Sequence, residues 1–402
     1  MWFLGGQASW FVAFGLQAVL FPFLVVNVLE ESPERVGIAQ MCLMAPALAL
    51  MVPGGMLADA SDLRKLLVTL QIAATAAPLV LAGLIGTGSA HFGVLIAFAL
   101  VHGSVQALVL PARDALLSRV SGGDIQRTIT TAMAVQFSCQ IVGFMFAASA
   151  SAIGAPVLLI TQACLYGLGA ICASRLLPVP PIRVSPPQTR RGAGAELLEA
   201  LRGVTHSTRI APIMLIMLGV GFIFIAVFSV VVPIMVRDLY RGGSIGLALI
   251  NASFVVGVLC ASAAMMRRPP VLHQGHTIFI AASVGAALTA SFGTQPPVVV
   301  FYTIIFLFGV ASGVLMSLGR TVVQEAAEPR LRARVLAIYS LGFLGSAPLG
   351  SFLVGQIAEV TGVLAAAVWG GAAMAVLLLA VGTFTPIWGI TRDPTSEPKV
   401  FR

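Results

Sequence analysis

Long runs of hydrophobic residues, separated by short segments that hold charges, glycines and prolines, follow one another along almost the whole chain. Each run has about the 20 residues that an α-helix needs to cross the hydrocarbon core of a membrane. The runs are too long for barrel strands and lack strict alternation of apolar and polar residues. The pattern predicts twelve transmembrane helices, at 4–28, 36–58, 66–87, 92–113, 128–150, 156–177, 211–236, 243–266, 276–293, 297–319, 334–357 and 363–386.

Residues 178–210 differ from the sequence on either side. They begin with a segment rich in proline and arginine, which is typical of a linker. An amphipathic stretch from Glu196 to Arg202 follows and predicts a short helix on the membrane surface. We therefore expect a six-helix half at 1–177, a cytoplasmic linker at 178–210, and a second six-helix half with a short cytoplasmic tail at 211–402.

The composition supports a membrane protein, because 58% of the residues are hydrophobic and only 9% are charged. A soluble domain carries about 25% charged residues. A soluble enzyme, a nucleic-acid-binding domain and a disordered chain are thereby excluded.

The net charge of +8 follows from topology. With the N-terminus inside, every Lys and Arg falls on the inner side except Arg35, Arg237 and Arg241. This positive-inside distribution predicts a multi-pass protein of the cytoplasmic membrane with both termini in the cytoplasm. It also indicates contact with the lipid bilayer and not with nucleic acid.

The two halves repeat. Arg113 and Arg127 enclose an inner loop of the first half, and Arg320 and Arg334 enclose the matching loop of the second half at the same spacing. We predict an all-α membrane protein whose twelve transmembrane helices form two pseudo-symmetric six-helix halves. Transporters built from parallel repeats bind their substrate between the halves, near the midplane of the membrane.

The loop after the second helix, residues 55–65, reads Gly-x-Leu-Ala-Asp-x-x-x-x-Arg-Lys. Gly55 can pack closely at the helix end, and Asp59 can pair with an arginine or with the N-terminus of a neighbouring helix. This pattern resembles the loop between helices 2 and 3 of the major facilitator superfamily, although Ala60 and Leu63 replace two common arginines.

Two further segments resemble one branch of that superfamily, which contains enterobactin exporters and macrolide-efflux pumps. They are residues 111–117, Pro-Ala-Arg-Asp-Ala-Leu-Leu, and a C-terminal run that spans 320–324, 332–336, 339–340 and 344–351. The resemblance covers nearly the whole chain. It implies a twelve-helix fold, alternating access and, commonly, proton-driven export.

The fifth helix departs from this branch. Antiporters of the branch often have Gly-Pro followed by paired glycines, whereas Gly143 is followed here by Phe-Met-Phe-Ala-Ala. On the eleventh helix Gly345, Pro348 and Gly350 are retained, and their small surfaces permit close helix packing. The departure keeps uptake or facilitated transport open as an alternative to proton antiport.

His102 is an ionisable residue near the middle of the fourth helix. An ionisable group at that depth indicates a functional site, and a histidine changes its charge near neutral pH. The alternative is a neutral histidine that is satisfied by one hydrogen bond to a neighbouring helix.

Polar residues elsewhere within the spans are also expected to face the bundle interior, because an amide exposed to lipid is costly. They either contact substrate or only connect helices. These candidates are Gln17, Gln106, Gln136, Gln140, Asn251 and Tyr339.

Charged residues at the inner helix ends predict a gate that closes when the cavity opens outward. Arg113 can pair with Asp59 or Asp114, and Arg320 can pair with Glu325. The alternative is that these residues are simple positive-inside anchors. The inner-gate candidates are Asp59, Arg64, Arg113, Asp114, Arg320 and Arg334.

The spans hold no deep acidic residue, while the seventh helix carries Phe222, Phe224, Phe228, Met214 and Met217. An apolar cavity wall suits a hydrophobic or amphipathic organic molecule, although the same residues could face lipid or pack within the bundle. We predict proton-coupled efflux of a siderophore-like or drug-like molecule. The alternatives are uptake or facilitated transport of a metabolite or lipid-like solute, and a membrane sensor or scaffold without transport.

No catalytic constellation and no Walker motif occurs in the sequence, so neither an enzyme nor an ATP-driven pump is predicted. The five cysteines lie in apolar runs, and His273 and His276 lack acidic partners. We expect no metal and no cofactor. The expected partners are a small-molecule substrate, protons and lipid, and we expect the protein to be a monomer.

Overall fold

The computed structural model describes residues 2–120, 125–176, 202–267, 271–328 and 332–391. Within these ranges the chain has twelve helices that are long and apolar enough to cross a membrane, which confirms the prediction. Most of the predicted linker, its surface helix before Arg202 and the C-terminal tail lie outside the described residues. Residues 202–206 are helical, and they begin at Arg202, the last residue of the predicted surface helix.

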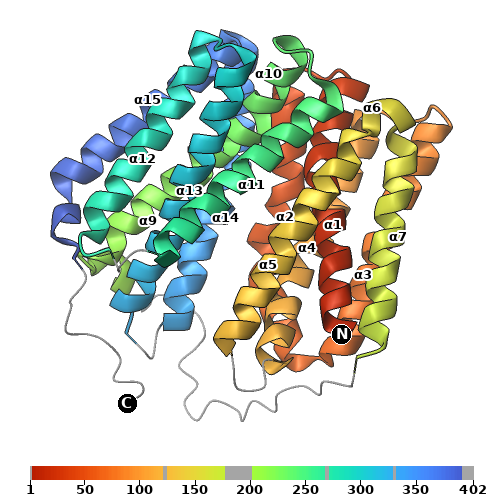
Figure 1. Cartoon of the computed structure of the whole chain (residues 1–402), viewed down its shortest axis with the longest axis horizontal. Helices are drawn as coiled ribbons and strands as arrows, with labels where there is room; N and C mark the ends of the chain where they lie inside the picture. The colour runs from red at the N-terminus through yellow and green to blue at the C-terminus, as the bar shows by residue number, and fades with distance from the viewer. Residues whose placement is uncertain (1, 121–124, 177–201, 268–270, 329–331, 392–402) are drawn as a thin grey trace. The chain divides into compact units, whose positions relative to one another are not determined.

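The first six spans form a bundle in which α1 packs against α5 and α7, α2 against α4, and α3 against α4 and α7 (Figure 1). A short helix, α6, connects α5 to α7 at the end of this bundle away from the N-terminus. The elements are α1 (Trp2–Phe23) with the π-helical turn η1 (Leu24–Val28), α2 (Pro33–Ala60), α3 (Leu63–Gly86), α4 (Phe92–Val120), α5 (Ile125–Ala148), α6 (Ala150–Ile153) and α7 (Ala155–Ser174).

The last six spans begin with a composite helix, because the seventh span contains two π-helical segments between α-helical ends. Its parts are α9 (Ile210–Gly219), η2 (Val220–Ile225), η3 (Val227–Val231) and α10 (Val232–Asp238). The other spans are α11 (Gly243–Arg267), α12 (Gln274–Ser291) with the 3₁₀ turn η4 (Phe292–Thr294), α13 (Val298–Ala326), α14 (Arg332–Thr361) and α15 (Val363–Phe384), which precedes the 3₁₀ turn η5 (Ile387–Gly389).

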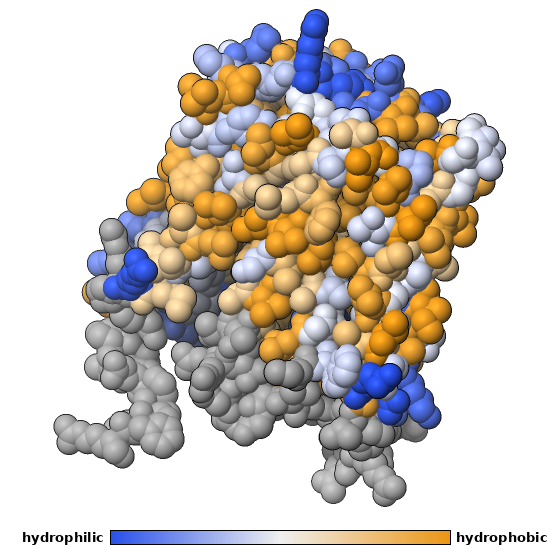
Figure 2. All heavy atoms as spheres, turned by 45° about the vertical axis from the view of Figure 1, so that its right-hand side comes forward, coloured by the Kyte–Doolittle hydropathy of each residue, from blue (hydrophilic) through white to orange (hydrophobic). Residues whose placement is uncertain are grey.

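The outer surface of the helices is apolar, as the surface of a membrane protein must be. Figure 2 shows hydrophobic side chains across the middle of one face and hydrophilic ones gathered at its upper edge. Large apolar side chains such as Met145, Val299 and Phe384 are 71%, 78% and 86% exposed. In lipid a helix satisfies its own backbone hydrogen bonds, which explains why these exposed apolar segments are helical.

The chain divides into two compact units whose boundaries differ from those of the predicted halves. The first unit contains residues 1–188, 228–252 and 351–363, and the second contains 189–227, 253–350 and 364–402. The first unit therefore includes η3, α10, the start of α11 and the end of α14, together with the first six spans. The predicted halves remain a description of the sequence repeat.

Three of the predicted helix-packing residues are the glycines Gly55, Gly143 and Gly350. The atoms nearest to a Cβ atom placed on each show whether another helix packs closely there. A Cβ atom on Gly143 would overlap backbone atoms of Val12 and Leu16, so α5 and α1 touch where only glycine fits. A Cβ atom on Gly350 would likewise overlap the carbonyl group of Phe222. For Gly55 the prediction of close packing is wrong, because no described atom lies within 4 Å of the position of a Cβ atom.

The neighbour of Gly55 makes the close contact instead. A Cβ atom on Gly54 would lie 3.1 Å from Leu108 and 3.2 Å from Pro111, both on α4. Successive residues of a helix point in directions about 100° apart, so a shift of one position moves the packing face from Gly55 to Gly54. The structure buries Gly345 and Pro348 on α14.

Candidate functional site

Polar side chains from three helices meet inside the first unit, and we call this group the His102 cluster. His102 is 1% exposed, and the exposed fractions of Gln17, Gln162 and Tyr166 are 3%, 0% and 0%. Such groups are costly to bury in an apolar bundle unless they find partners. The members of the His102 cluster are Gln17 of α1, His102 and Gln106 of α4, and Gln162 and Tyr166 of α7.

Hydrogen bonds connect the cluster from end to end. His102 Nε2 lies 2.9 Å from Gln106 Nε2 and 3.4 Å from the Tyr166 hydroxyl group. Gln162 Nε2 donates to Gln17 Oε1 at 2.8 Å and reaches the Tyr166 hydroxyl group at 3.5 Å. The cluster therefore ties α1, α4 and α7 together around one ionisable side chain.

Aromatic rings surround the cluster. The ring of Phe98 stacks on His102, with ring centroids 5.2 Å apart and an angle of 17° between the planes. Trp10 packs against Tyr166, with ring centroids 5.0 Å apart. These rings fill the space around the polar groups, so the exchange of a proton with water requires the surrounding helices to move.

Some polar atoms of the cluster have no hydrogen-bond partner among the described residues. Because Gln106 Nε2 is a donor, His102 Nε2 acts as the acceptor, and this places the proton of the neutral ring on Nδ1. Nδ1 of His102 has no hydrogen-bond partner among the described residues, and neither do Nε2 of Gln17 and Oε1 of Gln162. In this tautomer the ring takes up a further proton at Nε2, so protonation requires the contacts of Gln106 and Tyr166 with that nitrogen to rearrange.

Among the described residues, the other predicted polar candidates form no hydrogen bond with this cluster. On α5, Gln140 is 9% exposed and Gln136 is partly buried. Asn251 donates to the carbonyl group of Leu247 one turn earlier in α11, at 2.9 Å. The Tyr339 side chain is 6% exposed, and its hydroxyl oxygen fills the space beside Gly319 of α13.

The predicted inner gate is described only in part. The side chain of Asp59 lies outside the described residues, and Arg64 and Arg334 are partly buried. Asp114 and Arg320 are exposed. Glu325, the predicted partner of Arg320, accepts a hydrogen bond from Gln274 Nε2 at 3.0 Å.

Arg113 lies deeper than its place at a helix end predicts. Its side chain turns into the bundle and is 7% exposed. The guanidinium carbon lies 4.4 Å from the ring centroid of Phe11 and 5.4 Å from that of Trp10, both on α1. The structure thus shows it against aromatic rings of α1.

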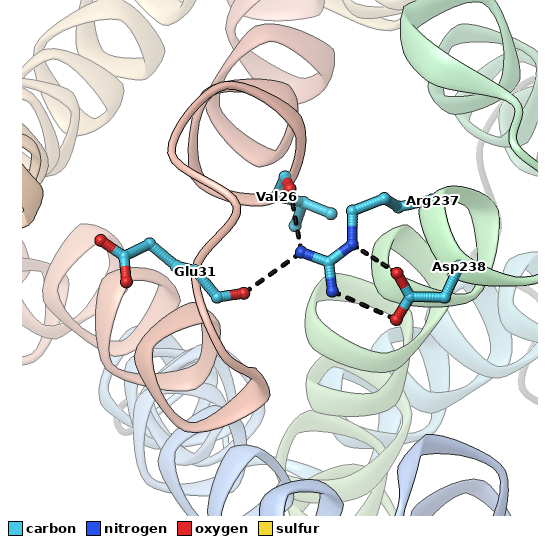
Figure 3. A network of polar contacts seen from close by, with 4 residues as sticks. All are labelled: Val26, Glu31, Arg237 and Asp238. Carbon is cyan, nitrogen blue, oxygen red and sulfur yellow. Dashed lines mark hydrogen bonds and ion pairs between the residues drawn. The ribbon is translucent and has the colours of Figure 1, made fainter.

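At the end of the first unit away from the N-terminus, one arginine connects segments that lie far apart in the sequence (Figure 3). Arg237 Nη1 donates to the carbonyl oxygens of Val26, at 3.0 Å, and Glu31, at 3.3 Å. Asp238 holds the other side of the guanidinium group, with distances of 2.5 Å to Nε and 3.1 Å to Nη2. We call these four residues the Arg237 clamp.

Arg237 binds carbonyl groups at the C-terminal end of the first span. The helix ends in the π-helical turn η1, and a helix end leaves carbonyl groups without partners inside the helix. A cation is stabilised at such an end by the helix dipole. The clamp was not predicted from the sequence, where its only signal is that Arg237 is one of three basic residues outside the predicted inner side.

Further contacts lie at the same end of the first unit. Gln356 of α14 donates to Glu34 Oε1 of α2 at 2.9 Å, and Glu359 Oε2 lies 3.4 Å from the Glu34 backbone nitrogen. Ser244 of α11 contacts Ser151 of α6 at 2.8 Å. Helix ends from both sequence repeats are therefore bound to each other here.

The comparisons with known proteins agree with this architecture. A family model described as a transmembrane secretion effector matches residues 7–393. A search of curated protein sequences finds no match.

Solved structures of transporters share the fold. The nucleoside transporter NupG is 15% identical, with a TM-score of 0.70 over 95% of this chain and 98% of that one. A POT family transporter in complex with 5-aminolevulinic acid is 13% identical, with a TM-score of 0.73 over 96% and 95% of the two chains. The human organic anion transporter MFSD10 is 16% identical, with a TM-score of 0.62 over 94% and 97%.

The family model spans nearly the whole chain, and the twelve spans have the fold of these transporters. The predicted resemblance to the superfamily is thereby confirmed, whereas its enterobactin-exporter and macrolide-efflux branch stays a prediction. The chain belongs to the transmembrane secretion effector family of the major facilitator superfamily and is a multi-pass secondary transporter.

Proposed function

We propose that the protein exports a small hydrophobic or amphipathic molecule, of the siderophore or drug type, in exchange for protons. The His102 cluster carries this proposal, because it places an ionisable side chain with an unpaired nitrogen inside the membrane span. Ionisable groups within spans commonly mark proton relays in transporters. The protein would act as a monomer in the cytoplasmic membrane, with both termini in the cytoplasm.

The Arg237 clamp supports alternating access. In the proposed orientation it lies at the outer end, where it holds helix ends of both repeats together. Opening that end requires the contacts of Arg237 to break. An inner gate that contains Asp59, Arg64, Arg320 and Arg334 would close the opposite end in the same step.

The experiment uses inverted membrane vesicles with an imposed proton gradient. Siderophores, macrolides and other hydrophobic compounds are added in turn, and the dissipation of the gradient is followed. We expect one compound class to dissipate the gradient, and we expect His102→Ala to remove this response at equal protein level. A response that His102→Ala leaves unchanged, including its pH dependence, would remove His102 from the mechanism.

A second candidate is uptake or facilitated transport. One observation favours it: Gly143 is followed by Phe144 and two alanines where antiporters of this branch have proline and glycines. The structure uses Gly143 for contact with α1. If no compound dissipates the gradient while labelled solute still equilibrates across the membrane, this candidate replaces proton-coupled export.

A further inference from the structure

The buried Arg113 has unused hydrogen-bonding capacity. It lies within the span Phe92–Leu117 and is 7% exposed. The rings of Trp10 and Phe11 stabilise its charge, but aromatic faces accept no strong hydrogen bond from the guanidinium edge. Nη2 of Arg113 has no partner among the described residues. Asp114 is close enough to interact with Arg113 electrostatically, but Nη2 still lacks a hydrogen-bond acceptor, which an oxyanion would supply.

Arg113 faces a small pocket between α1, α3, α4 and α7. Two buried amides line the same pocket, Gln7 at 7% exposure and Gln71 at 3%. The Nε2 groups of the two amides can donate to an oxyanion, whereas Oε1 of Gln71, which has no partner among the described residues, can only accept a hydrogen bond. A cation and two amides that converge between apolar walls have the donors to hold an oxyanion.

The rim of the pocket reaches the surface of the bundle at the aromatic ring of Trp2, which lines the pocket and is 51% exposed. The guanidinium carbon of Arg175 lies 5.8 Å from the centroid of this ring and adds a second cation at the rim. On the parts of α1 and α7 that contribute to the pocket, other apolar side chains are exposed: Leu4 at 40%, Leu168 at 53% and Ile171 at 55%. The rim therefore borders a surface suited to acyl chains.

We propose that this pocket binds the phosphate group of an anionic phospholipid. Arg113 and the amide of Gln71 bind phosphate oxygens, Arg175 attracts the headgroup, and the acyl chains lie along Leu4, Leu168 and Ile171. The pocket is small, so only headgroup oxygens enter it. Basic pockets between helices at the cytoplasmic membrane surface bind anionic headgroups in this manner. The proposal does not depend on the transported substrate.

The test counts lipids that stay bound to the purified full-length protein in native mass spectrometry. Dioleoyl phosphatidylglycerol is compared with dioleoyl phosphatidylcholine, which has the same chains and no net charge. We expect phosphatidylglycerol to bind with at least tenfold preference. Both lipids carry the phosphate group, but only phosphatidylcholine adds a cationic choline that cancels the net charge and that Arg113 and Arg175 repel, with an effect of about fivefold for each arginine. We expect Arg113→Gln to lose the preference.

If Arg113→Gln does not fold, a comparison of two other variants, Arg175→Gln and Arg267→Gln, still tests the proposal. Arg175→Gln changes an exposed rim residue and should weaken phosphatidylglycerol binding about fivefold. Arg267→Gln, an exposed cation at the end of α11, is the matched control and should leave binding unchanged. Equal binding of the two lipids, or equal effects of Arg175→Gln and Arg267→Gln, would overturn the proposal.

Inorganic phosphate separates a lipid from a soluble anion. We expect millimolar phosphate to leave bound phosphatidylglycerol in place, because the acyl chains add contact area. Displacement of the lipid by phosphate would identify a soluble-anion site and overturn the lipid assignment.

Discussion

At the scale of single residues, the His102 cluster shows how buried polar side chains of the first bundle hydrogen-bond to one another. Each hydrogen bond between transmembrane helices is worth only about 0.6 to 2 kcal/mol. The contact from Gln162 to Gln17 at 2.8 Å connects α7 to α1, and the contact from Tyr166 to His102 at 3.4 Å connects α7 to α4. The bonds therefore stabilise the bundle modestly, while the position of His102 among them is what a proton-coupled cycle requires.

We predict that transport by the wild-type protein depends on pH, because His102 is the ionisable group that takes up and releases a proton in the proposed cycle. His102→Gln keeps a hydrogen-bonding side chain but cannot titrate, so this pH dependence should disappear. Tyr166→Phe removes only the hydroxyl partner and should keep the pH dependence. Initial transport rates at a series of pH values check both outcomes, and a pH profile that His102→Gln retains would contradict the role of His102.

Gln162→Leu should lower the stability of the bundle without removing the ionisable group. The variant removes the donor to Gln17 Oε1 and leaves that buried acceptor unpaired, which costs about 1 to 3 kcal/mol. Thermal unfolding in detergent should show a lower midpoint for Gln162→Leu than for Thr161→Val, a partly buried neighbour whose hydroxyl group donates to the carbonyl group of Val157 in its own helix. Equal midpoints would show that the bond from α7 to α1 does not hold the bundle.

The sequence predicted part of this cluster. His102, Gln106 and Gln17 stand out because polar residues are rare in their runs. Gln162 and Tyr166 were not among the candidates, because only tertiary packing brings α7 against α1 and places Tyr166 beside His102 of α4. Burial of Arg113 was also unpredictable, because a basic residue at a helix end normally faces the membrane surface.

At the scale of elements, glycine positions set how closely helices approach. Gly143 and Gly15 face each other where α5 crosses α1, and a Cβ atom on either would overlap backbone atoms of the other helix. Such a contact permits only glycine, since a methyl group would push two backbones apart. The hydrophobic pattern of the sequence locates the helices. It does not show which of the two neighbours, Gly54 or Gly55, packs against α4.

Gly143→Ala should therefore destabilise the protein by about 1 to 3 kcal/mol, as overpacking does. Gly55→Ala is the matched control, because open space surrounds Gly55 among the described residues and alanine favours a helix. Thermal midpoints in the same detergent compare the two variants. A Gly143→Ala midpoint equal to that of Gly55→Ala would refute the close contact.

At the scale of the whole molecule, the twelve spans and membership of the major facilitator superfamily follow from the hydrophobic pattern and the motifs, because both are features of the linear sequence. The Arg237 clamp does not, because it joins Arg237 to Val26 and Glu31 across the two repeats. Its partners are backbone carbonyl groups, which leave no mark in the sequence. The proposed alternating access requires this end to open, and we expect the clamp to oppose the opening.

Arg237→Gln should favour the open state of this end. Spin labels at the exposed positions Ser89 and Val360, at this end of the first unit, report the opening as a longer mean distance in pulsed electron resonance. Arg241→Asn is the matched control: Arg241 is exposed, and its φ of 49° suits asparagine. If both variants leave the distance distribution of the wild-type protein unchanged, the clamp does not hold this end.

The central claim is that the protein moves a small molecule with energy from protons. The most direct measurement uses purified protein in proteoliposomes and follows one responding compound, labelled, while a pH gradient is imposed or withheld. The account predicts accumulation above the external concentration only with the gradient, and no accumulation for His102→Ala. Equilibration to the external concentration with or without the gradient would contradict proton-coupled transport.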